Sequence, residues 1–122
     1  MAVIAVVDDE QAWRDLFSEA LTAAGHTVAT FSGGVAVPHQ VAAKGPDLIV
    51  LDIRMYPSGR EILRSLRQLL PGTPVLVVST YGGYRDDPDF ASAAAFLEKS
   101  PDTGRLLETV DALLRHAPSA SG

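Results

Sequence analysis

Two groups of acidic residues follow apolar runs, and their placement points to metal chemistry. Asp8, Asp9 and Glu10 follow the apolar run 2–7, and Asp52 follows the apolar run 48–51. Such runs are typical of parallel strands that are buried on both faces. Because parallel strands share a carboxyl edge, where open α/β sheets bind ligands, these carboxylates are expected to meet at one spot. Clustered carboxylates repel one another, so the pattern favours a hard divalent cation such as Mg²⁺ beside one reactive Asp.

Three other residues fall near the same predicted edge and extend this chemistry. Ser79 ends the apolar run 74–79, Lys99 follows the run 95–98, and Phe96 lies three positions before Lys99. With the acids they form the layout of a phosphoryl-accepting site, in which the Asp52 carboxylate attacks phosphorus and forms an acyl phosphate. Positioning and charge neutralisation dominate such a transfer. Lys99 would bring a mobile positive charge to one phosphoryl oxygen, and Ser79 a hydroxyl donor to another.

Each of these residue types also has an ordinary structural interpretation. Acids that follow a strand can stabilise the start of the next helix, and a lone lysine is usually a solvated surface residue. The site interpretation is favoured because all of these residues fall at one predicted sheet edge. Trp13 is interpreted as helix packing. The histidines are scattered and are not interpreted as metal ligands or phosphate carriers: His26, His39 and His116.

The elements that must position these residues alternate between strands and helices. Short apolar runs predict strands at residues 2–7, 27–31, 47–53, 74–79 and 95–98. Three-and-four spacing of apolar residues predicts helices at 10–24, 59–70 and 103–115, with a weaker helix at 34–44. The stretch 81–88 is rich in Gly, Asp and Tyr, so the helix expected there is short. Five strands alternating with five helices predict an α/β fold with a doubly wound parallel sheet. The flavodoxin-like strand order 2-1-3-4-5 is expected, because it brings strands one and three together at a switch point.

Three residues mark where these helices should start and stop. Gly25 is predicted to cap the C-terminus of the first helix. Pro38 fits only the first turn of the second helix, because it lacks a backbone donor. Asp102 is predicted to cap the N-terminus of the last helix.

The composition bounds the class of protein. The chain has 122 residues, of which 47% are hydrophobic, so one domain is expected at 1–116, with 117–122 as a flexible tail or the start of a linker. The net charge of −5 argues against nucleic-acid binding by this segment. The absence of cysteine excludes thiolate metal sites and fits a cytoplasmic location. The N-terminal apolar run is too short for a signal peptide or a membrane span.

The motifs resemble a known family, the receiver domains of two-component response regulators, which include the chemotaxis-regulator-like proteins. The resemblance covers about residues 3–114. It implies that Asp52 is phosphorylated by a histidine kinase or a histidine phosphotransfer protein, and that Lys99 is the phosphoryl-binding lysine. Four motifs in the right order carry it: Val6-Val7-Asp8-Asp9-Glu10, Leu51-Asp52-Ile53-Arg54-Met55, Pro74-Val75-Leu76-Val77-Val78-Ser79 and Phe96-Leu97-Glu98-Lys99.

The resemblance also implies metal ligands and a switch. Asp9, helped by Asp8, is implied as the metal acid, and the backbone carbonyl of Arg54 as a further Mg²⁺ ligand. Ser79 is implied as the switch hydroxyl. Phe96 is implied as the aromatic residue that turns inward once Ser79 is drawn to the phosphoryl group.

The resemblance further implies partners and a mode of action. The readout face would lie on the fourth helix, fifth strand and fifth helix, near residues 84–114, and the same face could form a homodimer. The partner there would be a downstream output protein or domain. The chain is expected to act as a stand-alone receiver or as part of a larger regulator or hybrid kinase. It is not expected to be an enzyme beyond self-catalysed phosphoryl transfer and autodephosphorylation.

The chain departs from the family pattern at four places. The loop 56–59 is one residue shorter than usual, and the stretch 79–96 is also short. Ser100 follows Lys99 where the family commonly has Pro, so a cis peptide bond is less favourable there. Thr80 stands where Ala is usual. None of these departures removes a chemical group from the site.

Alternatives from other functional classes stay open. A pseudo-receiver, which would bind proteins without phosphotransfer, is motivated by the altered loop and by Ser100. An aspartyl phosphatase usually needs a second acid two residues after the nucleophile, where this chain has Arg54. A flavin-binding domain is disfavoured because Asp8-Asp9 would repel its phosphate. If Asp52 is phosphorylated, Arg54 and Tyr81 flank the site and are predicted to slow hydrolysis of the acyl phosphate.

Overall fold

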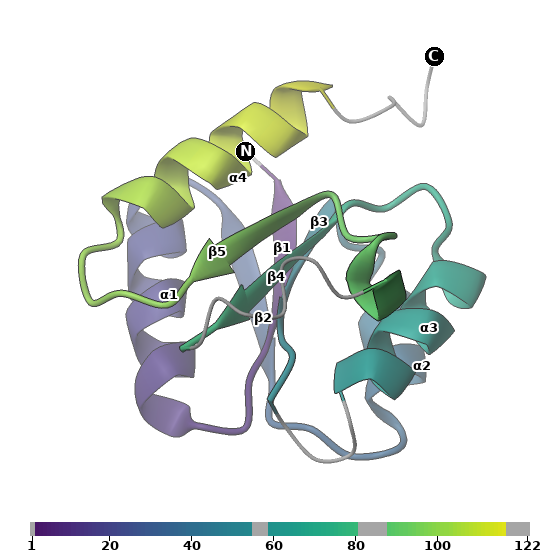
Figure 1. Cartoon of the computed structure of the whole chain (residues 1–122). Helices are drawn as coiled ribbons and strands as arrows, with labels where there is room; N and C mark the ends of the chain where they lie inside the picture. Colours follow the sequence, from purple (N-terminus) through teal and green to yellow (C-terminus); the bar gives the residue numbers. More distant parts are fainter. Residues whose placement is uncertain (1, 55–58, 81–87, 117–122) are drawn as a thin grey trace.

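The fold is a five-stranded parallel sheet between two layers of helices (Figure 1). The computed structural model describes residues 2–54, 59–80 and 88–116. The strand order is β2-β1-β3-β4-β5, and every pairing is parallel. The predicted fold class and strand order are therefore confirmed. The strands are β1 Val3–Val7, β2 Thr27–Phe31, β3 Leu48–Asp52, β4 Val75–Ser79 and β5 Ala95–Glu98.

The helices of the described residues are divided between the two faces of the sheet. In Figure 1, α1 and α4 lie on one side of the strands, and α2, α3 and the short η2 lie on the other. The two buried clusters of side chains follow the same division. The helices are α1 Gln11–Ala23, α2 Val37–Ala43, α3 Gly59–Leu69, α4 Gly104–His116 and the 3₁₀ helix η2 Pro88–Phe90.

Four α-helices and the short η2 lie within the described residues, and the fifth predicted helix, near 81–88, falls almost wholly outside them. Residues 81–87 lie outside the described part of the chain, and the described residues that follow form only η2. The backbone N–H of Ala94 already donates to the carbonyl of Val75 at 2.8 Å. Because this hydrogen bond joins the chain to the sheet, the segment after η2 cannot continue as a helix.

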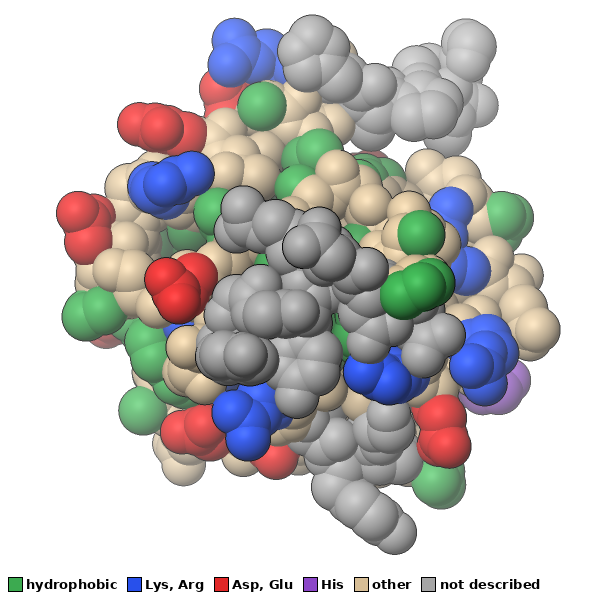
Figure 2. All heavy atoms as spheres, in the orientation of Figure 1, with side chains coloured by type: hydrophobic (Ala, Val, Ile, Leu, Met, Phe, Trp, Pro, Cys, Tyr) green, Lys and Arg blue, Asp and Glu red, His purple; other side chains and the backbone are tan. Residues whose placement is uncertain are grey.

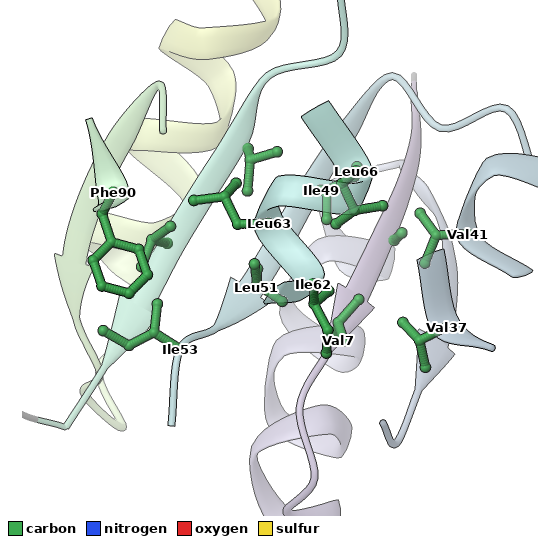
Figure 3. Close-up of a cluster of buried hydrophobic side chains, with 13 residues drawn as sticks. Val7, Val37, Val41, Ile49, Leu51, Ile53, Ile62, Leu63, Leu66 and Phe90 are labelled. Carbon is green, nitrogen blue, oxygen red and sulfur yellow. The ribbon is translucent and has the colours of Figure 1, made fainter. Parts of the chain in front are cut away.

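The core explains why the strand sequences are almost continuously apolar. All five residues of β3 and all five of β4 are buried. Alternate side chains point to opposite faces, so one set packs under α2, α3 and η2 (Figure 3) and the other under α1 and α4. Phe90 of η2 is 5% exposed and packs against the edge of the first cluster. This three-layer packing fixes the strand ends that carry the acids.

The predicted start and stop residues act as expected. Gly25 has φ of +99° after α1, a conformation that costs glycine little. Pro38 lies in the first turn of α2. The Asp102 carboxylate accepts a hydrogen bond of 2.9 Å from the backbone N–H of Gly104, where α4 begins.

The surface carries charges of both signs. On the face seen in Figure 2, acidic and basic side chains are interspersed at the left, whereas mostly basic side chains lie at the right, where Figure 1 shows α3. None of the helices described is long and apolar enough to cross a membrane.

Candidate functional site

The carboxyl ends of β1 and β3 bring three acids together. These strands are neighbours, and Val7 is in register with Leu51, so the acids that follow them leave the sheet at the same level. The carboxylate oxygens that Asp8, Asp9 and Asp52 offer lie within 4.8 Å of one another. Asp8 and Asp52 are 1% and 2% exposed, whereas Asp9 is exposed. The predicted meeting of carboxylates is therefore confirmed for these three acids, whereas Glu10 is exposed and is not part of the group.

Lys99 brings a buried positive charge to this cluster. It follows β5, and its backbone N–H donates to the carbonyl of Ser79 at 2.7 Å. Its Nζ atom lies 2.7 Å from Oδ2 of Asp8 and 3.2 Å from Oδ2 of Asp52. The Lys99 side chain is only 1% exposed, so solvent screens these two ion pairs weakly. One ammonium thus partly neutralises two buried carboxylates.

The two buried carboxylates are oriented in the same way. Oδ1 of Asp8 accepts a hydrogen bond of 2.9 Å from the backbone N–H of Glu10. Oδ1 of Asp52 accepts one of 3.0 Å from the N–H of Arg54. Each acid therefore uses one oxygen to hold its own turn and directs the other toward Lys99. The sequence positions of the acids alone do not show which oxygen takes which role.

The backbone around Asp8 is fixed from two sides. Its N–H donates to the carbonyl of Phe31 in β2 at 3.0 Å. Its carbonyl accepts a hydrogen bond of 2.7 Å from Nη1 of Arg14 in α1. Sequence analysis did not identify Arg14, although its place in the first turn of the helix after Asp8-Asp9 is a usable signal.

Burial decides the electrostatics of Asp8. Loss of solvent raises the pKa of its carboxyl above the ordinary value, and the charge of Asp52 acts in the same direction. The ion pair with Lys99 and the N–H of Glu10 oppose this rise. Oδ2 of Asp8 is buried and lies 2.7 Å from Nζ of Lys99. A buried carboxylate oxygen of this kind is a suitable ligand for a hard cation.

Ser79 and Phe96 also lie where the sequence predicts. Ser79 ends β4, is fully buried, and is in register with Glu98. Phe96 in β5 is partly buried and meets Phe90 edge to face, with ring centroids 6.3 Å apart. The guanidinium of Arg60 in α3 lies over the ring of Phe90, 5.2 Å from its centroid. The aromatic pair thus links β5 to η2 and α3.

Trp13 is nearer to the site than sequence analysis indicates. Its ring centroid lies 5.1 Å from Nζ of Lys99 and 5.5 Å from the ring of Phe17. The contact with Phe17 confirms the prediction that Trp13 packs on its helix. The contact with Lys99 was not predicted. The available signal is again position, because Trp13 lies in the first turn of a helix that begins at the acidic edge.

Other predicted features lie away from the site or outside the described residues. His26 accepts a hydrogen bond of 3.2 Å from the N–H of Ala2, which fits a structural role. Arg54 is exposed, and its proposed carbonyl ligation stays a prediction. Most of the shortened loop and Tyr81 lie outside the described residues, so the predicted effects of both stay predictions.

Sequence comparison relates the chain to signalling proteins. A family model described as "Response regulator receiver domain" matches residues 4–111. The DNA-binding transcriptional regulator NtrC of Escherichia coli strain K12 is 35% identical over 80 residues, which cover 65% of this chain and 17% of NtrC. Response regulator MprA of Mycobacterium ulcerans is 33% identical over 115 residues, which cover 92% of this chain and 50% of MprA. The chain therefore spans half or less of the length of these relatives.

Structural comparison agrees over nearly the whole chain. TrrA from Thermotoga maritima, solved in complex with Mg²⁺-BeF, superposes with a TM-score of 0.87 at 31% identity and covers 93% of this chain and 99% of that one. TrrA in complex with the histidine kinase ThkA gives a TM-score of 0.80 at 30% identity, with the same coverage. Strand order, acidic cluster and family match all agree, and the chain belongs to the response regulator receiver domains.

Proposed function

We propose that Asp52 is the phosphoacceptor of this receiver domain. Its phosphoryl donor would be a histidine kinase or a histidine phosphotransfer protein. An Asp52 carboxylate oxygen forms the bond to phosphorus, the bond from phosphorus to the donor imidazole nitrogen breaks, and that nitrogen keeps the electron pair. The observation that carries the proposal is the convergence of two buried carboxylates on the ammonium of Lys99. Such a fixed charge can stabilise the negative oxygens of a transferring phosphoryl group.

Mg²⁺ is the cofactor that fits the acidic cluster. Asp8, Asp9 and Asp52 supply hard oxygen ligands close together, and Oδ2 of Asp8 is buried beside the Lys99 ammonium. We propose these three acids and the backbone carbonyl of Arg54 as the metal ligands. When bound, Mg²⁺ would neutralise charge on the transferring oxygens.

Lys99, Ser79 and Phe96 are proposed to read the phosphoryl group. Lys99 is already 3.2 Å from the Asp52 carboxylate, so a small movement would bring it to a phosphoryl oxygen. Ser79 is buried at the end of the adjacent strand, and its hydroxyl would donate to a second oxygen. Phe96 would follow Ser79 inward. Such a change shifts a pre-existing equilibrium between two states.

Two kinds of partner are proposed, a phosphodonor and an output protein or domain. TrrA, which is similar in structure, was solved with the histidine kinase ThkA, and this supports a kinase as phosphodonor. The longer relatives include the DNA-binding transcriptional regulator NtrC, and this supports an output protein or domain as the receiver of the signal. A homodimer through the fourth predicted helix, β5 and α4, a cytoplasmic location, and self-catalysed phosphoryl transfer and autodephosphorylation as the only chemical activities remain proposals from the sequence. So does the division into a domain at 1–116 and a tail.

The test is the intact mass of the protein after incubation with acetyl phosphate, with and without Mg²⁺. Wild type should gain one phosphoryl group only with Mg²⁺, and Asp52→Asn should gain none. Asp111→Asn is the matched control, because this acid lies on the exposed face of α4 with a side chain that is 63% exposed, and it should behave as wild type. An equal adduct on Asp52→Asn would contradict the assignment. A folded wild type that neither gains the adduct nor responds to beryllofluoride would favour a pseudo-receiver.

A further inference from the structure

Trp13 and Lys99 form a contact that the proposed phosphotransfer chemistry has not used. Trp13 is half-buried in the first turn of α1, and its ring centroid is 5.1 Å from Nζ of Lys99. A cation within about 6 Å of an indole ring is attracted by the negative face of the ring. The Lys99 side chain is 1% exposed, and loss of solvent strengthens this attraction.

The surroundings of the ammonium show why this contact matters. Nζ of Lys99 has three donors, and its charged partners are Oδ2 of Asp8 and Oδ2 of Asp52. The Asp8 oxygen belongs to the same cluster that suits a divalent cation. A cation bound there would compete with Lys99 for Asp8. Of the charged and aromatic contacts that the ammonium makes within the described residues, those with Asp52 and with the Trp13 ring would then remain.

We propose that Trp13 is a positioning residue that holds the ammonium of Lys99 beside Asp52 when Asp8 turns to a bound cation. This inference rests on the proposed function, because it assigns the lysine to the phosphoryl group. Trp13 touches neither phosphorus nor metal in this account, and it acts only through Lys99. The competing explanation is plain packing of Trp13 against Phe17, whose ring centroid is 5.5 Å away.

Three substitutions separate positioning from packing. Trp13→Leu removes the ring face and keeps an apolar side chain, whereas Trp13→Phe keeps a weaker ring face. Phe17→Leu is the matched control, because Phe17 is 3% exposed and packs on Trp13 but is not a partner of the ammonium. Circular dichroism should first establish a temperature at which all three variants are folded.

The first readout is the rate of phosphorylation by acetyl phosphate at saturating Mg²⁺, followed by intact mass. Trp13→Leu should be slower than wild type by about five- to thirtyfold, Trp13→Phe by less, and Phe17→Leu should match wild type. A Trp13→Leu rate equal to that of wild type would overturn the proposal. Equal slowing by Trp13→Leu and Phe17→Leu would also overturn it, since packing alone would then account for the loss.

The second readout does not depend on phosphorylation. An indole close to Lys99 should shift the NMR signals of its ε-methylene protons upfield, and the shift should vanish in Trp13→Leu and persist in Phe17→Leu. If wild type is not phosphorylated at all, the proposed function fails while this measurement still tests the contact. Unshifted ε-methylene protons in wild type, with and without Mg²⁺, would overturn the positioning role. Because Trp13 is the single tryptophan of the chain, no other indole can cause the effect.

Discussion

Replacing Lys99 with Met should strongly destabilise the domain when no divalent cation is present. Met retains an apolar stem of similar length but removes the charge that lies 2.7 Å from Asp8 and 3.2 Å from Asp52. Removing one partner of a buried ion pair costs about 3–5 kcal/mol, because the remaining charge stays buried and uncompensated. Here two carboxylates, 1% and 2% exposed, would be left facing each other. A loss in that range is a large part of the roughly 5–15 kcal/mol by which domains are stable.

A divalent cation should restore much of the stability that Lys99→Met loses. Mg²⁺ at about 100 times its dissociation constant stabilises a folded protein by about 2.7 kcal/mol. Mg²⁺ should stabilise wild type less than it stabilises Lys99→Met, because in wild type it must displace the Lys99 ammonium from Asp8. The measurement is urea unfolding at pH 7, followed by circular dichroism, in EDTA and in Mg²⁺. Lys44→Met is the matched control, since Lys44 is exposed and should change stability by less than about 0.5 kcal/mol.

The free energy of unfolding that Lys99→Met loses relative to wild type should become smaller as the pH falls. Burial raises the pKa of Asp8 above its ordinary value of 3.8, and Lys99 opposes this rise. A raised folded-state pKa means that the folded protein binds the proton more readily than the unfolded chain does. Stability from this group is therefore gained as pH falls through the folded pKa, and lost as pH rises through it. Without Lys99 the pKa of Asp8 rises further. The difference in free energy of unfolding between Lys99→Met and wild type should therefore be smaller at pH 5 than at pH 7.

If Lys99→Met unfolds at the same urea concentration as Lys44→Met in EDTA, and neither Mg²⁺ nor lower pH changes the comparison, the buried carboxylates are not the source of instability. Asp8→Asn in the Lys99→Met background provides the internal check. It removes one of the two charges, so it should recover stability at pH 7 and weaken the response to pH.

Two predictions concern the elements that hold the site. Gly59→Ala should lower the free energy of unfolding by about 1–3 kcal/mol, because its Cβ would lie 2.5 Å from the backbone of Ile53; Gly72→Ala, whose Cβ meets nothing within 4 Å, should change it by less than about 0.5 kcal/mol. Equal urea midpoints for both alanine variants would contradict this. Asp102→Ala should cost about 0.5–1 kcal/mol, because it removes the carboxylate that accepts from the N–H of Gly104. Thermal unfolding measures this loss, and Asp102→Asn, which keeps an acceptor, should retain most of the stability.

The strands and the acidic edge were predictable because local pattern and topology agree. A strand buried on both faces must be apolar throughout, and β3 and β4 are buried at every residue. Short connections and the handedness of parallel crossovers leave few possible strand orders. Once β1 and β3 are neighbours, Asp8 and Asp52 must emerge together. The family resemblance pointed to Lys99 as well.

The segment between β4 and β5 was less predictable for a physical reason. Its composition is rich in residues that favour turns, so local propensity does not define a helix there. In the described residues that follow, the early return of Ala94 to the sheet limits the helical structure to η2. Phe90 then fills the edge of the core beside Phe96. Tertiary contact, and not propensity, therefore decides the conformation of residues 88–94.

The sequence by itself determined the fold class, the strand order and the edge at which the acids meet, because these follow from burial patterns and parallel topology. Only the tertiary structure decided how the charges are shared. It directs one oxygen of each buried acid to a backbone N–H and the other to Lys99, and it places the ring of Trp13 beside that ammonium. Side-chain orientation depends on packing between residues that are far apart in the chain, and residue order does not encode it in any local pattern.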